Sequence, residues 1–138
     1  MRTVVTGMTR PEDGNTRLVR VLVVDDQAPF RQAARAVVSV TPGFEVVAEA
    51  ESGEEAVALA HLLAPDVVLM DVHLPGINGM AACRAIVDEH PATTVLLLST
   101  YREEDVPGST RSCGAQAYVN KEHFGPDTLE HLGRSDAA

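Results

Sequence analysis

The stretch VVLMDVHLPGING, residues 67–79, decides the expected fold. Its continuous apolar start indicates a strand buried on both faces, as in a parallel sheet covered by helices on each side. Asp71 stands where this strand ends, and the Pro75-Gly76 and Asn78-Gly79 pairs that follow predict a tight loop before the next helix. Ligands of open α/β sheets bind outside the carboxyl ends of the strands, so Asp71 is a candidate site residue. The alternative is an Asp that only caps a turn.

The same pattern recurs on both sides of this stretch. A β-branched run ends in Asp25 and Asp26, an apolar run leads into Ser99, and a late run ends in Asn120-Lys121. Apolar and alternating patterns of this kind predict strands. The five expected strands are residues 18–24, 45–50, 67–71, 94–98 and 115–119, with 45–50 on the outside of the sheet.

Helical spacing of apolar residues separates these strands. Four helices are expected. The first begins near Pro29 and stops at Thr41-Pro42-Gly43, and the second runs from a Ser52 and Glu55 capping box to Leu63. The third runs from about Gly79 to His90, and the fourth from Asp127, with Glu130, to about Arg134. A further crossover helix would fall between Arg102 and Ser112, where Pro107-Gly108 predicts a short or irregular element. The alternation predicts an α/β fold, a five-stranded parallel sheet with helices on both faces.

The length of 138 residues fits one domain. We expect a loose tail at residues 1–16, a domain at residues 17–135 and a short tail at residues 136–138. Cys83 and Cys113 lack metal-ligand spacing, so reduced thiols and a cytoplasmic location are expected. No apolar run approaches the ~20 residues that a membrane span needs.

The net charge of −9 opposes binding to nucleic acid and to anionic lipid, and the aromatic fraction of 4% supplies few stacking residues. A cationic partner or a metal is easier to accommodate. Ten of the basic residues are Arg, so Lys121, the only lysine, needs a specific explanation.

Polar residues from four strands should meet at the carboxyl edge of the sheet: Asp25, Asp26, Asp71, Ser99 and Lys121. Three carboxylates in one crevice repel unless a cation holds them together. Oxygen ligands without His or Cys spacing favour Mg²⁺. A metal, an ammonium and a hydroxyl around one carboxylate suit phosphoryl transfer, in which that carboxylate can become an aspartyl phosphate.

With these residues in place, the chain resembles the receiver domain of response regulators in two-component signalling, over roughly residues 18–134. The resemblance implies a flavodoxin-like receiver topology in which Asp71 is the phosphoacceptor. It also implies an Mg²⁺ site made by the Asp25-Asp26 pair, Asp71 and the His73 carbonyl. The other roles that it implies are a switch hydroxyl at Ser99, a switch aromatic at Tyr118 and a phosphate-pairing lysine at Lys121.

The resemblance further implies that a histidine kinase donates the phosphoryl group and that the phosphate alters an output surface, with no other enzymatic activity. The Val-rich strands and Gly114-Ala115 resemble receivers that precede a LuxR/NarL-type helix-turn-helix domain. DNA would then be contacted only through a domain outside these residues. The chain is either a stand-alone receiver or a piece of a longer protein, of which we favour the second, and a homodimer is left open.

Other interpretations are an aspartyl-nucleophile phosphatase for small phosphate esters, a flavodoxin-like cofactor binder and a pseudo-receiver that signals without phosphate. Such phosphatases commonly need an acid two residues after the nucleophile, where this chain has His73. A flavodoxin-like binder would need a phosphate loop after the first strand, where this chain has acids. Tyr118 is equally expected in core packing, His73 in a solvated loop, and Cys83 in helix packing.

Overall fold

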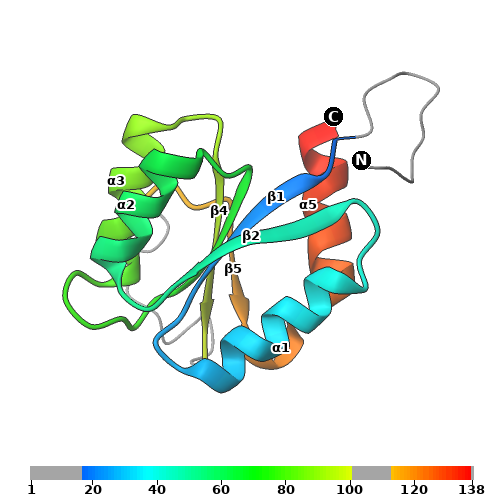
Figure 1. Cartoon of the computed structure of the whole chain (residues 1–138), viewed down its shortest axis with the longest axis horizontal. Helices are drawn as coiled ribbons and strands as arrows, with labels where there is room; N and C mark the ends of the chain where they lie inside the picture. The colour runs from blue at the N-terminus through cyan, green and yellow to red at the C-terminus, as the bar shows by residue number, and fades with distance from the viewer. Residues whose placement is uncertain (1–16, 101–112, 138) are drawn as a thin grey trace.

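The computed structural model describes residues 17–100 and 113–137, which form a parallel sheet with helices on both faces (Figure 1). The strands are β1 (Val19–Val24), β2 (Phe44–Ala50), β3 (Val67–Asp71), β4 (Thr94–Ser99) and β5 (Ala117–Asn120). Their order across the sheet is β2-β1-β3-β4-β5, and every neighbouring pair is parallel. The predicted parallel sheet is confirmed, and so is the outer position of the second strand.

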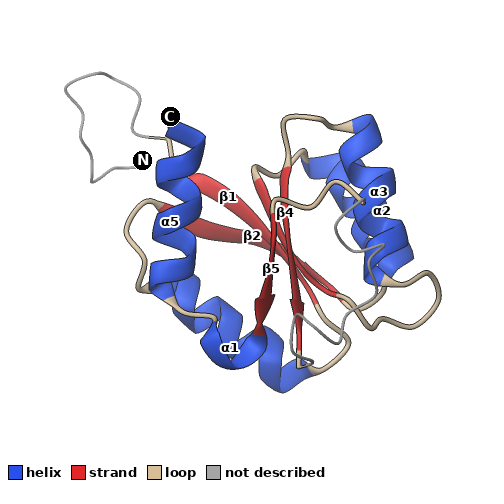
Figure 2. Cartoon of the chain, turned by 180° about the vertical axis from the view of Figure 1, so that it is seen from behind, coloured by secondary structure: helices blue, strands red, loops and turns tan. Residues whose placement is uncertain are grey.

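The described helices are α1 (Ala28–Ser39), α2 (Gly53–Leu63), α3 (Gly79–Glu89) and α5 (Pro126–Ala137), with a 3-10 turn, η2 (Lys121–His123), after β5. Helices α1 and α5 cover one face of the sheet, and α2 and α3 cover the other (Figure 2). The predicted tail at residues 1–16 and the predicted irregular element at 102–112 lie outside the described residues. Among the described helices, none has the length and apolar character to cross a membrane.

The core has two layers because successive side chains of a strand point to opposite faces. Val68 and Met70 of β3 pack in the layer beneath α2 and α3, whereas Val67 and Leu69 pack in the layer beneath α1 and α5. All four are at most 1% exposed. This two-sided burial explains the continuous apolar run, and it leaves Asp71 as the polar residue that ends a fully buried strand.

Local signals set most boundaries. The Ser52 hydroxyl accepts a hydrogen bond from the Glu55 N–H at 3.1 Å, which confirms the expected start of α2. The Glu55 carboxylate in turn accepts from the Glu51 N–H at 2.8 Å, one residue before the usual capping-box donor.

The last strand and helix differ from the expected bounds. β5 begins at Ala117 rather than residue 115, because ladder pairing with β4 starts only where the Gln116 N–H donates to the Val95 carbonyl at 2.8 Å. α5 begins at Pro126, which suits a first helical turn, and so places Asp127 inside that turn rather than at the cap. The helix continues to Ala137, beyond the expected end near Arg134 and into the expected C-terminal tail.

Candidate functional site

Strand register brings the predicted polar residues to one edge. Asp71 pairs with Leu98 on β4, so Ser99 lies one residue beyond the pairing partner of Asp71. Ser99 pairs with Asn120 on β5, and Lys121 follows directly. On the other side, Met70 pairs with Val24 of β1, after which Asp25 comes next. The register therefore brings the carboxyl ends of β1, β3, β4 and β5 to the same edge of the sheet.

Three carboxylates gather at this edge. Oxygen atoms of Asp25, Asp26 and Asp71 all lie within 4.8 Å of one another, with Asp25 and Asp71 buried and Asp26 exposed. Burial raises the pKa of Asp71, nearby Lys121 lowers it, and the Asp25 charge raises it again, with a net rise. A cluster this poor in positive charge fits a hard divalent cation, which takes oxygen ligands. The donor set thus matches the predicted Mg²⁺ site.

Lys121 contributes a positive charge beside two of these three carboxylates. Its Nζ lies 2.6 Å from Asp25 Oδ2 and 3.6 Å from Asp71 Oδ2, and its side chain is only 10% exposed. The buried Asp25 Oδ2 atom contacts Lys121 through this 2.6 Å ion pair and makes no hydrogen bond of regular geometry. Lys121 begins the η2 turn directly after β5, and its ammonium contacts Asp25, which follows β1, and Asp71, which ends β3.

The loop after Asp71 is held close to the sheet by its backbone. The Val72 N–H donates to the Leu98 carbonyl at 2.9 Å, and the Gly79 N–H donates to the Val72 carbonyl at 2.8 Å. A Cβ at residue 79 would collide with the carbonyl oxygen of Asp71, so only glycine permits this approach. The His73 N–H also donates to Asp71 Oδ1 at 3.3 Å, which orients the carboxylate.

The loop is further tied to α2. The Ile77 N–H donates to Glu54 Oε2 at 3.1 Å, and Gly76 adopts the left-handed region at φ 74°. Asn78 then caps α3 by accepting from the Ala81 N–H at 2.9 Å. The predicted turn chemistry is therefore present, and it fixes the chain that follows Asp71.

The other predicted site residues, Ser99, Tyr118 and His73, differ in their burial. Ser99 is fully buried at the end of β4. Tyr118 is half-buried, pairs with Leu97 in register and packs against the core layer beneath α2 and α3. The His73 side chain is exposed beside Asp71. The switch roles of Ser99 and Tyr118 and the ligand role of the His73 carbonyl stay predictions.

Two residues that contact the site have no distinctive sequence pattern. The Lys121 ammonium lies 4.5 Å from the centre of the Phe30 ring, a cation–π contact. Arg31 donates from Nη1 to the Asp25 carbonyl at 2.7 Å. Both lie in the first turns of α1, where Phe30 matched the apolar periodicity of any helix. Only their nearness to the Asp25-Asp26 pair could have suggested a role.

Comparisons with known proteins agree with this geometry. The family model described as "Response regulator receiver domain" matches residues 21–132. The chain is 36% identical over 111 residues to "Transcriptional regulatory protein DegU" of Brevibacillus brevis, covering 80% of this chain and 47% of that protein. It is 39% identical over 104 residues to "Response regulator GacA" of Pseudomonas viridiflava, covering 75% of this chain and 49% of that protein. The chain thus spans about half the length of these curated relatives.

A solved structure of a receiver domain also resembles this chain. The signal receiver domain of the putative response regulator NarL from Mycobacterium tuberculosis superposes with a TM-score of 0.80 at 28% sequence identity. The match covers 88% of this chain and 98% of that domain. Both the sheet order and the positions of the covering helices therefore have a counterpart in a known structure.

Proposed function

Because this chain belongs to the response regulator receiver domain family, it has the phosphoacceptor role of two-component signalling, and we propose that Asp71 is the residue that accepts the phosphoryl group. The observation that carries this proposal is the position of the Asp71 carboxylate. It lies among two further carboxylates and 3.6 Å from the Lys121 ammonium, at the carboxyl edge of the sheet. Asp71 is also the acid that ends the central strand β3.

The proposed reaction transfers a phosphoryl group from a phosphohistidine of a histidine kinase. A carboxylate oxygen of Asp71 attacks phosphorus, the P–N bond to the histidine breaks, and the imidazole leaves with a proton. The Lys121 ammonium pairs with the charge on the phosphoryl oxygens as the P–O bond forms. Positioning and charge neutralisation are the main requirements of phosphoryl transfer, and this edge supplies both.

Receiver domains generally use Mg²⁺ at an acidic pocket of this kind, and the residues present fit that ion. The proposed ligands are the carboxylates of Asp25, Asp26 and Asp71 together with the His73 carbonyl. When bound, the ion supplies positive charge to the phosphoryl oxygens.

Signal output is proposed to follow from the added charge of about −1.5 to −2. The Ser99 hydroxyl, at the end of the adjacent strand, donates to the phosphate, and Tyr118 repacks into the space that Ser99 leaves. This changes the surface near β5 and so changes what the domain binds. Apart from gaining and losing its own phosphate, the domain is proposed to have no enzymatic activity.

The curated relatives are longer than the region that this chain matches. DegU is named a transcriptional regulatory protein and GacA a response regulator, and each is about twice as long as its matched region. We propose that this receiver controls a LuxR-type DNA-binding module that is not among these residues. Cytoplasmic action, as expected from the sequence, is part of this proposal.

Phosphorylation by a small donor tests the proposal. Acetyl phosphate with Mg²⁺ should add one phosphoryl group to the chain, as seen by intact mass. Asp71→Asn should abolish the addition, and Asp88→Asn, an exposed acid on α3, should leave it unchanged. Unchanged labelling of Asp71→Asn would refute the site. Continuous turnover of phosphate esters with no phosphoprotein would instead favour the phosphatase alternative, for which the described residues 17–100 and 113–137 provide no particular support.

A further inference from the structure

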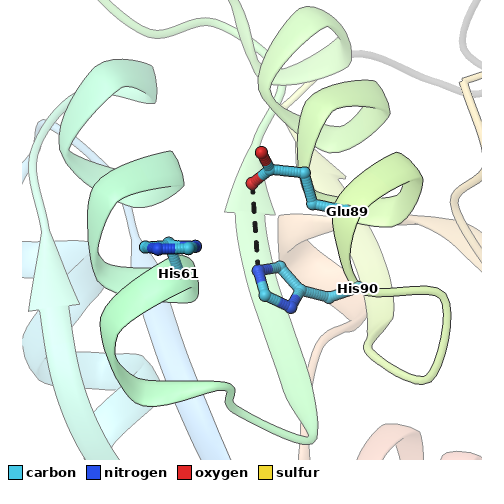
Figure 3. Close-up of side chains that lie close together, drawn as sticks. All are labelled: His61, Glu89 and His90. Atoms are coloured by element: carbon cyan, nitrogen blue, oxygen red, sulfur yellow. Dashed lines mark ion pairs between the residues drawn. The ribbon is translucent and has the colours of Figure 1, made fainter.

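A second cluster of ligating side chains lies between α2 and α3. His61 in the last turn of α2, Glu89 at the end of α3 and His90 at its C-cap each offer one ligand atom, and these atoms all lie within 4.8 Å of one another. Figure 3 shows His61 on one helix, with Glu89 and His90 on the other. From these residues we propose a binding site for a divalent transition metal ion, of which Zn²⁺ is the best fit.

His90 Nε2 is a buried polar atom whose hydrogen-bonding capacity is unsatisfied. It is buried, has no hydrogen-bond partner, and its nearest charged neighbour is Glu89 Oε1 at 3.9 Å, too far for a hydrogen bond. A polar nitrogen left in this state costs free energy. A metal ion between the two groups would satisfy both the nitrogen and the carboxylate.

The backbone holds His90 in place. Its N–H donates to the Ile86 carbonyl at 2.7 Å, and its carbonyl accepts from the Thr93 N–H at 2.9 Å. The side chains of His61 and Glu89 are exposed and can move toward it. Zinc–ligand bonds of ~2.1 Å place tetrahedral ligand atoms about 3.4 Å apart, so the cluster closes with small side-chain rotations.

The donor set decides the class of metal. Two imidazoles and one carboxylate suit Zn²⁺ and similar ions, whereas Mg²⁺ and Ca²⁺ prefer oxygen ligands throughout. Three protein ligands leave a further position for water. The C-terminal ends of both helices also carry partial negative charge, which favours a cation at this point.

This site is separate from the acidic cluster. Asp71 lies at the carboxyl end of β3, whereas His61 and His90 lie just before β3 and β4 begin, at the opposite edge of the sheet (Figure 1). A metal here would clamp the ends of α2 and α3 together without contacting the phosphoacceptor. The expected effect is therefore on stability, through preferential binding to the folded chain.

Cobalt(II) is a suitable probe because its visible absorption reports coordination number. The whole chain, with excess Mg²⁺ present to occupy the acidic cluster, should bind one equivalent of Co²⁺ with the intense bands of a four- or five-coordinate ion, and Zn²⁺ should remove those bands. His61→Ala, which changes an exposed side chain, should weaken binding more than about tenfold, since even outer partners of ligands contribute 10–100-fold. His131→Ala, an exposed histidine of α5, is the matched control.

The same variants give a second readout. Zn²⁺ should raise the Tm of the wild-type chain and of His131→Ala, but not that of His61→Ala. Equal Co²⁺ binding by His61→Ala and the wild type would overturn the proposal. So would the absence of saturable Co²⁺ binding by the wild type, or weak six-coordinate bands alone.

Discussion

Lys121 Nζ lies 2.6 Å from Asp25 Oδ2, closer than its 3.6 Å distance to Asp71 Oδ2. In this state the ammonium is thus paired mainly with the acid at the end of β1, and the Phe30 ring lies 4.5 Å from it. A phosphoryl group on Asp71 would offer Lys121 a stronger partner on the Asp71 side. The pair therefore links the stability of the domain to its proposed phosphorylation site.

Replacing Lys121 should reveal the cost of an unpaired buried acid. Lys121→Met keeps the length of the side chain but leaves Asp25, which is fully buried, without its cation. Loss of one partner of a buried pair costs about 3–5 kcal/mol, so the free energy of unfolding in urea without divalent ions should fall by that order. Added Mg²⁺ should recover part of the loss.

The control for this variant is Arg35→Met. Arg35 pairs with Glu49 at 2.8 Å but is 51% exposed, so its removal should change stability by only about 0–1 kcal/mol. Equal destabilisation of the two variants would mean that the Lys121 contact has no special energetic role.

Asp71→Asn should stabilise the metal-free domain at neutral pH. Burial raises the pKa of Asp71, so the folded state holds this proton more tightly than the unfolded chain does. The corresponding stability is present at low pH and is lost as pH rises through the folded-state pKa. Asparagine avoids that loss, and a gain of roughly 0.5–2 kcal/mol at pH 7 is expected. Urea unfolding across pH measures it, and lower stability of the variant at pH 7 would contradict the account.

Gly79→Ala should displace the loop that follows Asp71. The added Cβ would collide with the Asp71 carbonyl, and an overpacked position of this kind costs about 1–3 kcal/mol. Labelling by acetyl phosphate should slow as well, because Asp71 moves. Gly125→Ala is the matched control, since a Cβ there meets nothing within 4 Å. Normal labelling and stability of Gly79→Ala would show that this close approach is unimportant.

Asp66→Asn tests an ion pair remote from the site. Burial opposes ionisation of Asp66, but hydrogen bonds from the Arg17 guanidinium and the Arg20 N–H outweigh it and hold the pKa below its ordinary value. Its stabilisation is full above the unfolded-state pKa and is lost as pH falls through the folded-state value. Because Arg17 is 63% exposed, only ~0.5–1 kcal/mol should be lost at pH 7.

The pH dependence of the stability loss in Asp66→Asn distinguishes a lost ion pair from a change in packing. The difference between Asp66→Asn and the wild type should disappear in acid, whereas Asp88→Asn, an exposed residue, should match the wild type throughout. A constant difference at every pH would rule out the ion pair as its cause.

The sequence predicted the sheet and its polar edge because both follow from simple periodicities. Buried strands read as continuous apolar runs, and the residues that end them, Asp25, Asp71 and Ser99, then share an edge by register. The capping role of Ser52 is predictable because its hydroxyl has a local partner, the Glu55 N–H, three residues on. These inferences required only local chemistry and one fold rule.

Contacts between distant elements could not be predicted in this way. Nothing in the pattern of α1 shows that Phe30 would lie against Lys121 or that Arg31 would reach the Asp25 carbonyl. The meeting of His61 with His90 likewise depends on how α2 and α3 pack. β5 begins later than the expected residue 115 because ladder pairing with β4, rather than propensity, decides where that strand begins.

The central claim is that Asp71 itself carries the phosphoryl group, and chemical mapping tests it most directly. Borohydride reduces an acyl phosphate to an alcohol, so treating the acetyl-phosphate-labelled protein should convert the modified aspartate to homoserine. Fragment masses should then place homoserine at position 71 and leave Asp25 and Asp26 unchanged. Homoserine at position 25 or 26, or in none of the three while the phosphate is present, would contradict the account.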